Sequence, residues 1–530
     1  MNYRLVARML GAIAWLIGGT MVFSLPWALP AFRQTSTFEH GGFWALLASI
    51  GICGLVGYAL RIAGRGVSAT IYRKEAMAVV GLSWILATVL GALPFYLSGT
   101  GRDVDLTGNL IPMNIVDCLF ESQSGFSTTG ATVLTDLENK DLVPRCILFW
   151  RSGTHFLGGL GIIVLFVAVL GQGSAGKALM RAEMPGPNQE GTQTRMQQTA
   201  WTFAGIYCAL NAVLAVLLRL EGMRWYDAIC HAFGTMATGG FSTYNASLGH
   251  FASDPNCHGT AIEATVVIFM ILAGTNFTLL YFLLLRRPGR LLADVEWRTY
   301  MAIIFGVTAM VMAFGMWHVS AGEEPDFANW RAALRYGLFQ VVSIMTTTGY
   351  GTHDFDGWNS FGRGVLFLMM FVGGCAGSTG GGMKVIRHIL ILKIIKQEIE
   401  HSYHPTVVRP LRLDRQPIED PDLRHNILVY FGLILVIFVF SWMLLVTWEP
   451  DTTWQNGSGS TLENKLIDSA SGIAATLNNI GPGLGTVGAK RNYAHFSTQS
   501  KLLFTWLMMV GRLEIFVILV LFTPGFWRNR

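Results

Sequence analysis

Long apolar stretches recur along the whole of this 530-residue chain, and they constrain its fold more than any other feature. Hydrophobic residues make up 52% of the sequence and charged residues only 13%, so a water-soluble fold would leave large apolar surfaces exposed. Many stretches are about 20 residues long, the length with which an α-helix crosses the hydrocarbon layer of a membrane. Because the stretches do not alternate between apolar and polar residues, a transmembrane β-barrel is excluded. The sequence therefore predicts an all-α integral membrane protein.

The candidate spans are 9–31, 43–63, 76–98, 145–171, 198–220, 260–286, 298–318, 361–395, 425–448 and 499–523. The first follows Arg4 and Arg8. It exceeds the usual apolar core of a signal peptide, about 7–15 residues, and no A-x-A site follows it, so we interpret it as an uncleaved helix.

Basic residues account for the net charge of +5, and they gather in alternate loops. The intervening loops carry acidic residues such as Asp103, Glu323 and Glu449. The positive-inside rule then predicts a multi-pass protein with both termini in the cytoplasm. Because the basic residues follow this membrane pattern, no binding of nucleic acid is expected. Seven cysteines occur singly, without the spacing of a metal site, and are interpreted as small apolar residues of the core.

Four of the outer loops contain a half-hydrophobic segment that is too short and too rich in glycine to span a membrane. The segments are Asn114 to Thr132, Trp225 to Thr243, Arg331 to Thr352 and Lys465 to Gly485, and they contain SGFSTTGAT, GTMATGGFS, SIMTTTGYG and TLNNIGPGL. Aligned on Gly130, Gly239, Gly349 and Gly481, they recur at spacings of 109, 110 and 132 residues. Such a repeat indicates a structural unit, here a helix, a re-entrant loop and a second helix.

The repeats divide the chain into two N-terminal helices (1–70), four tandem helix–pore loop–helix units (71–175, 195–290, 297–396 and 424–530) and a cytoplasmic linker (397–423). Non-helical backbone at membrane depth must be buried in protein or line a water-filled cavity. Four such loops are therefore expected to meet around a central pore.

A pore of this kind suits a cation, because rings of backbone carbonyls can replace the hydration shell of the ion. Glycine allows the left-handed backbone that aligns successive carbonyls, and the helix before each loop directs its partly negative C-terminus toward the centre. The expected filter residues are Thr128, Thr129, Gly130, Ala237, Thr238, Gly239, Thr347, Thr348, Gly349, Asn479, Ile480 and Gly481.

With T-T-G-A-T, A-T-G-G-F, T-T-G-Y-G and N-N-I-G-P-G at its loops, the chain resembles the Trk/Ktr/HKT superfamily of potassium transporters. The two extra N-terminal helices resemble the membrane subunit of the bacterial Trk system. The resemblance implies a potassium pathway through each protomer, a homodimer in the bacterial inner (plasma) membrane, and a cytosolic TrkA-like regulatory subunit that binds nucleotide. In this superfamily a serine at the first filter glycine accompanies sodium permeation, and here that residue is Gly130. No organic cofactor is expected in this chain.

A run of glycines from Gly373 to Met383, GGCAGSTGGGM, interrupts the second helix of the third unit. Each glycine costs the helix up to about 1 kcal/mol, so a break in the membrane is expected. A phosphate-binding loop is disfavoured because the lysine does not directly follow a G-x-x-x-x-G pattern and no strand precedes the run. Close packing of helices through small residues is the alternative. The resemblance implies an intramembrane loop that obstructs the path, formed here with Gly373, Gly374, Gly377, Gly380, Gly381 and Gly382.

Arg512 is predicted in the middle of the last helix, where an arginine costs about 2.5–3.5 kcal/mol unless it faces a polar interior. An ion pair with a carboxylate is one interpretation, although Glu514, two residues on, points to another side of the helix. The resemblance implies instead that Arg512 is an electrostatic barrier to cations beside the glycine loop, and the two are expected to form a gate.

The basic segments Gly171 to Thr199 and Lys384 to Arg424 are either solvated, attracted to the lipid surface, or docking sites for the regulatory subunit. A transporter that couples potassium or sodium to protons or sodium is the main alternative function. A transporter of organic substrates would show inverted halves rather than four repeats in one orientation. A membrane enzyme is disfavoured because His155, His231 and His388 are scattered along the sequence.

Overall fold

The fold was analysed in a computed structural model of the chain. It describes residues 1–30, 38–66, 72–104, 109–164, 193–318, 327, 329–405, 412–413, 416–417, 422–454, 461–513 and 515–528. Parts of the two segments expected to dock a regulatory subunit, namely 171–192, 406–411, 414–415 and 418–421, lie outside these residues, as does Glu514.

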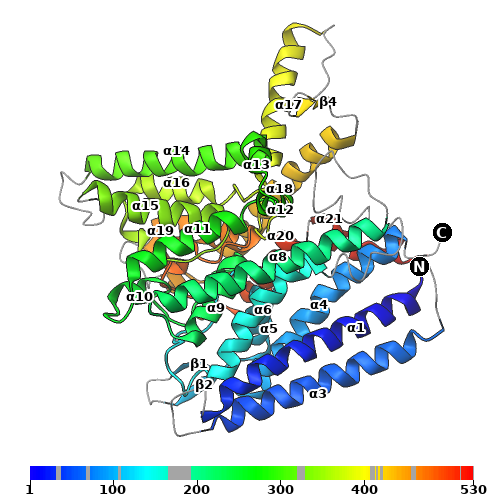
Figure 1. Cartoon of the computed structure of the whole chain (residues 1–530). Coiled ribbons are helices and arrows are strands. Elements are labelled where there is room, and N and C mark those ends of the chain that lie inside the picture. Colours follow the sequence, from blue (N-terminus) through cyan, green and yellow to red (C-terminus); the bar gives the residue numbers. More distant parts are fainter. Residues whose placement is uncertain are drawn as a thin grey trace.

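An N-terminal helical hairpin lies at one edge of the bundle (Figure 1). It consists of α1 (Tyr3–Met21), the 3₁₀ helix η1 (Val22–Ala28) and α3 (His40–Ala63). The two long helices approach closely at glycines, since a Cβ on Gly11 would lie 2.7 Å from the carbonyl oxygen of Gly57. The two chain ends meet, because the Tyr3 hydroxyl donates to the carbonyl of Trp527 at 2.7 Å (Figure 1).

Four units follow, each with a long helix, a short helix that enters a loop, and a second helix. Unit one has α4 (Arg73–Leu97), α5 (Ile115–Phe126) and α6 (Arg145–Val164), and unit two has α8 (Gln193–Leu220), α9 (Trp225–Met236), α11 (Gly259–Ala273) and α12 (Phe277–Leu284). Unit three has α14 (Val295–His318), α15 (Trp330–Met345), α16 (Ser360–Met369) and α17 (Val385–Tyr403). Unit four has α18 (Asp422–Trp448), α19 (Thr461–Leu477), α20 (Thr498–Arg512) and α21 (Ile515–Leu521).

Short elements join these helices. They are the antiparallel pairs β1 (Gly101–Val104) with β2 (Leu110–Pro112) and β3 (Arg412–Leu413) with β4 (Gln416–Pro417), the helices α10 (Gly249–Ser253), α13 (Pro288–Ala293) and α22 (Pro524–Trp527), and the 3₁₀ turns η5 (Phe355–Gly357), η6 (Asp451–Trp454) and η7 (Gly485–Val487).

Several second helices are broken. The spans expected as continuous at 260–286 and 499–523 are each two helices, so these two expectations were wrong. The chain bends by 109° between α11 and α12. The break lies between Gly274 and Asn276, and the Asn276 side chain accepts from Thr278 N and caps α12. The third unit breaks between α16 and α17, as the glycine run predicts. Among the described helices, six are long and apolar enough to span a membrane alone, and a seventh is obtained if α11 and α12 count as one.

Large apolar side chains cover much of the outside of the bundle. Trp44, Trp201 and Leu368 are more than half exposed, which fits contact with lipid rather than water. The chain is therefore an all-α membrane protein, as the sequence predicts.

Candidate ion pore

The four short helices end in the same way. α5, α9, α15 and α19 are each followed by one capping residue and then by a residue with a left-handed backbone: Thr128 (φ 52°), Thr238 (55°), Thr347 (59°) and Asn479 (55°). The next residue donates its N–H to the carbonyl five residues back, at 2.8–2.9 Å in all four loops. The one after that is a glycine with positive φ: Gly130 (83°), Gly240 (74°), Gly349 (78°) and Gly481 (98°). One backbone shape is thus repeated four times.

This shape is strained where the left-handed residue is threonine. A branched Cβ is a steric outlier at positive φ, and such a residue costs of order 1–3 kcal/mol. Glycine is the usual residue at this position after a helix. Threonine at Thr128, Thr238 and Thr347 is therefore maintained against its conformational preference, which points to a functional role for these loops.

The structure shifts the alignment of the second loop by one residue. Gly240, rather than Gly239, has the positive φ and matches Gly130. Gly239 matches Thr129, and Ala237 is the cap of α9, equivalent to Ser127. Two adjacent glycines give two possible alignments in sequence, and the backbone angles distinguish them.

The four loops contact one another in cyclic order. A Cβ added to Gly130 would overlap the carbonyl of Gly239 in loop two, and one on Gly240 would overlap that of Thr348 in loop three. In the same way, Gly349 meets the carbonyl of Ile480 in loop four. The ring closes because a Cβ on Gly481 would lie 2.5 Å from the carbonyl of Thr129 in loop one.

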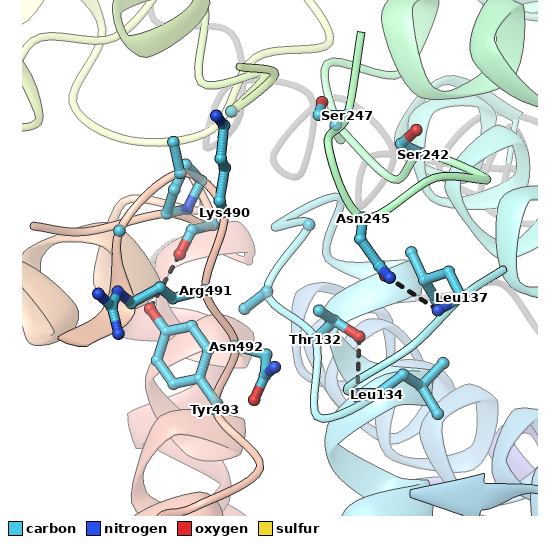
Figure 2. A pocket seen from close by; sticks show the side chains of 18 of the residues that line it. Thr132, Leu134, Leu137, Ser242, Asn245, Ser247, Lys490, Arg491, Asn492 and Tyr493 are labelled. Atoms are coloured by element: carbon cyan, nitrogen blue, oxygen red, sulfur yellow. Dashed lines mark hydrogen bonds between the residues drawn. The ribbon is translucent and has the colours of Figure 1, made fainter. Parts of the chain in front are cut away.

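One hollow lies on the outer side of this ring, and all four glycines line it: Gly130, Gly240, Gly349 and Gly481. Figure 2 shows residues of units one and two, among them Thr132 and Asn245, facing Lys490 and Tyr493 of unit four across it. The four glycines of the ring are therefore reached from this hollow.

A buried ion pair joins loops one and two. Arg151 of α6 donates from Nε to Glu121 of α5 at 2.5 Å and from NH1 to the carbonyl of Ser242 at 3.0 Å. Glu121 in turn accepts from Val133 N at 3.0 Å, three residues after Gly130 in loop one. Because both charged groups are almost fully buried, loss of one would leave the other unpaired. The pair therefore fixes two loops at once.

A histidine adds to this joint. His155 Nδ1 hydrogen bonds with the carbonyl of Gly125 in α5 at 2.8 Å, and His155 Nε2 accepts from Phe241 N in loop two at 3.1 Å. From sequence alone, His155 was only one of three scattered histidines. An arginine within a membrane span is costly to insert, so the sequence marks Arg151 as a candidate polar contact in the same way as Arg512.

The other joints use different chemistry. The hydroxyl of Tyr350 in loop three donates to the carbonyl of Phe241 in loop two at 3.3 Å. Between loops three and four, Asp356 accepts from Gly485 N at 2.8 Å. Asn479 donates to Thr129 Oγ1 of loop one at 2.9 Å, which gives the divergent asparagine of loop four a structural role.

The glycine run between α16 and α17 lies directly against the inner side of the ring. Gly381 N donates to Thr347 Oγ1 at 2.7 Å, and Thr379 Oγ1 donates to the carbonyl of Met236, the last residue of α9. The loop also packs on the break between α11 and α12, where Cys375 N donates to the carbonyl of Gly274 at 2.9 Å. Of its glycines, Gly377 and Gly382 have positive φ, so the run forms an ordered loop in these described residues.

Arg512 contacts this loop. Its NH1 donates to the carbonyl of Thr379 at 2.7 Å and its NH2 to the carbonyl of Gly158 in α6 at 3.2 Å. The expectation that Arg512 lies in mid-helix was wrong, because α20 ends there. At a helix C-terminus a positive charge is favourable, which lowers the cost of burying this arginine.

A ring of four glycine loops, closed inside a bundle of apolar helices and obstructed on one side by a further loop, defines a polytopic membrane protein with a central four-segment pore. The comparisons specify its family. Residues 46–528 match the family model of TrkH, described as a cation transport protein. The chain therefore belongs to the TrkH family.

Its relatives are named as transporters rather than enzymes. The chain is 33% identical to the Trk system potassium uptake protein TrkH of Halomonas elongata over 535 residues, and 33% identical to the TrkH of Escherichia coli over 532 residues, with all of each chain covered. The crystal structure of the potassium transporter TrkH from Vibrio parahaemolyticus matches the whole fold with a TM-score of 0.81 at 30% sequence identity, again over all of both chains.

The alignment of the second loop can be tested by substitution. We expect Gly240→Ala to lower both cation flux and the potassium/sodium flux ratio in proteoliposomes, because its Cβ would overlap the carbonyl of Thr348 at a left-handed position. Ala237→Ser introduces the residue that unit one has at the equivalent cap, Ser127. We expect it to leave the potassium/sodium flux ratio unchanged. If Ala237→Ser lost its potassium/sodium selectivity while Gly240→Ala kept normal flux, Gly239 rather than Gly240 would be the residue equivalent to Gly130.

Proposed function

We propose that this chain takes up potassium across the bacterial inner membrane through a channel-like pore whose selectivity filter is the ring of four loops. The cyclic contact of those loops is the observation that carries the proposal. It gives each left-handed residue, its successor and its glycine a place where their carbonyls can replace the hydration shell of a cation. The names of the full-length relatives, potassium uptake proteins, support potassium as the ion.

The filter residues are then those of the shared backbone shape. They are Thr128, Thr129, Gly130, Thr238, Gly239, Gly240, Thr347, Thr348, Gly349, Asn479, Ile480 and Gly481. The fourth arm differs in its asparagine and in Pro482, whose Cδ would lie 2.8 Å from a Cβ on Gly349. A ring of unequal arms supports weaker discrimination than a four-fold symmetric filter would give.

The driving force requires no further machinery. A cell interior that is negative by about 100 mV favours entry of each cation by about 2.3 kcal/mol. Both termini are assigned to the cytoplasm, because basic residues flank both ends and the ends lie together.

The gate in this proposal is the loop with Gly373, Gly374, Gly377, Gly380, Gly381 and Gly382, held by Arg512. The position of the loop supports this assignment. The loop hydrogen bonds to Thr347 of the filter on one side and to the Arg512 guanidinium on the other. A buried guanidinium in low dielectric repels a passing cation, and the glycines permit the loop to change shape.

Regulation is proposed to act from the cytosol, through a nucleotide-binding subunit docked on a homodimer of this chain. The "Trk system" in the names of the relatives supports a multi-component assembly. The helix α17 directly continues the gate loop and projects from the bundle (Figure 1), with Ile399 and Tyr403 exposed near its end. Such a helix is suited to transmit the binding of a partner to the loop.

The identity of the ion is tested by growth of a potassium-uptake-deficient bacterium at low potassium, together with flux measurements on Gly130→Ser. We expect the wild-type chain to restore growth with its regulatory partner. Gly130→Ser should reduce the potassium/sodium flux ratio by about tenfold, a change of about 1.4 kcal/mol, because its Cβ displaces the carbonyl of Gly239 from the ring. Gly153→Ser is the matched control, since nothing lies within 4 Å of a Cβ there. An unchanged ratio in Gly130→Ser would remove this glycine from the filter.

The gate is tested at Arg512 in reconstituted protein without a partner. We expect Arg512→Gln to raise potassium flux by about tenfold, because removal of a repulsion of about 1.4 kcal/mol is sufficient for that factor. Arg512→Lys keeps the charge and should stay close to wild type. Equal flux in all three proteins would show that Arg512 is not a barrier.

A further inference from the structure

A single buried carboxylate contacts both ends of the intramembrane loop. Glu296 lies in the first turn of α14 and is 9% exposed. Its Oε1 accepts the backbone N–H of Ala376 at 2.8 Å and that of Ile386 at 3.0 Å. The first donor belongs to the start of the loop and the second to the first turn of α17, so one oxygen bridges the two sides of the loop's base.

Two backbone hydrogen bonds also close the base of the intramembrane loop. Gly373 N donates to the carbonyl of Met383 at 2.7 Å, and Val385 N donates to the carbonyl of Gly374 at 3.1 Å. These bonds join the loop to itself, whereas Glu296 joins it to another helix. Glu296 thus fixes the base of the loop to α14, next to the bond from Cys375 N to the carbonyl of Gly274.

The tip of the loop is held by other means, namely by Thr347 of the filter and by Arg512. If its base were free, the loop could move away from the ring once the contacts of its tip break. A fixed base prevents this movement. The position of Glu296 is therefore suited to keep the loop across the path.

From this geometry we propose that Glu296 is a positioning residue of the gate: it clasps the two ends of the intramembrane loop and stabilises the obstructing conformation. The inference rests on the proposed gating function of the loop, and it adds a residue outside the loop and outside the last helix. It acts through the loop backbone and does not itself contact the ion.

The native Cys375 provides a direct reporter. It lies beside Ala376 inside the loop and is fully buried, and its N–H bonds to Gly274. In a chain whose other six cysteines are replaced by serine, its rate of modification by a small methanethiosulfonate reagent measures release of the loop. Potassium flux is measured in the same proteoliposomes, and the melting temperature in detergent shows whether each variant is folded.

Glu296→Leu removes the acceptor at similar volume, and Glu296→Gln keeps an acceptor oxygen without the charge. We expect Glu296→Leu to accelerate modification of Cys375 by about tenfold and to raise potassium flux, since two hydrogen bonds at the base of the loop are lost. Glu296→Gln should accelerate it by about threefold, because its amide oxygen still accepts while its NH2 group, unlike the second carboxyl oxygen, cannot. If the leucine variant does not fold, the glutamine variant decides the question on its own.

Glu263→Leu is the matched control. Glu263 is also a buried carboxylate, 4% exposed, but it pairs with Arg335 rather than with the loop. Unchanged modification of Cys375 in the folded Glu296 variants would overturn the proposal, and so would an equal acceleration in Glu263→Leu. Faster modification without increased flux would leave the clasp in place and reject the loop as a gate.

Discussion

Backbone that leaves a helix inside a membrane must find its hydrogen-bond partners within the protein, and the rest of this structure depends on how four loops meet that requirement. Each loop turns through a left-handed residue and a glycine, and each glycine lies against a carbonyl of the next loop. No single loop could be stable alone at this depth. The ring closes only when all four units are present, which explains why one chain carries four repeats.

The joints between the loops are unequal, although the loop backbones are alike. An ion pair and a histidine join loops one and two, a tyrosine hydroxyl joins loops two and three, and Asn479 joins loops four and one. The side chains have therefore diverged where the loops touch, while the backbone that faces the centre has kept its shape. A similar division applies to the intramembrane loop, whose tip contacts Thr347 and whose base contacts α14 through Glu296.

The repeat and its glycines predicted the all-α membrane fold and the left-handed glycines Gly130, Gly349 and Gly481, because backbone conformation at these positions depends on residue type. The second loop was misaligned by one residue, since Gly239 and Gly240 are equivalent in sequence and differ only in φ. The breaks after Ala273 and Arg512 were missed because each lies in a few residues between two apolar runs, which together have the length of one span. Partners such as Glu296 and Ala376 are 80 residues apart, and no local pattern links them.

The central claim is that the closed ring selects potassium, and the reversal potential of the purified chain in planar bilayers tests it most directly. With equal concentrations of potassium on one side and sodium on the other, we predict a cation current whose reversal potential is displaced from zero in the direction expected when potassium permeates better than sodium. Rubidium should replace potassium with little change, whereas chloride should carry no current. A reversal potential near zero, or a current carried by anions, would contradict the assignment of the four loops as a potassium filter.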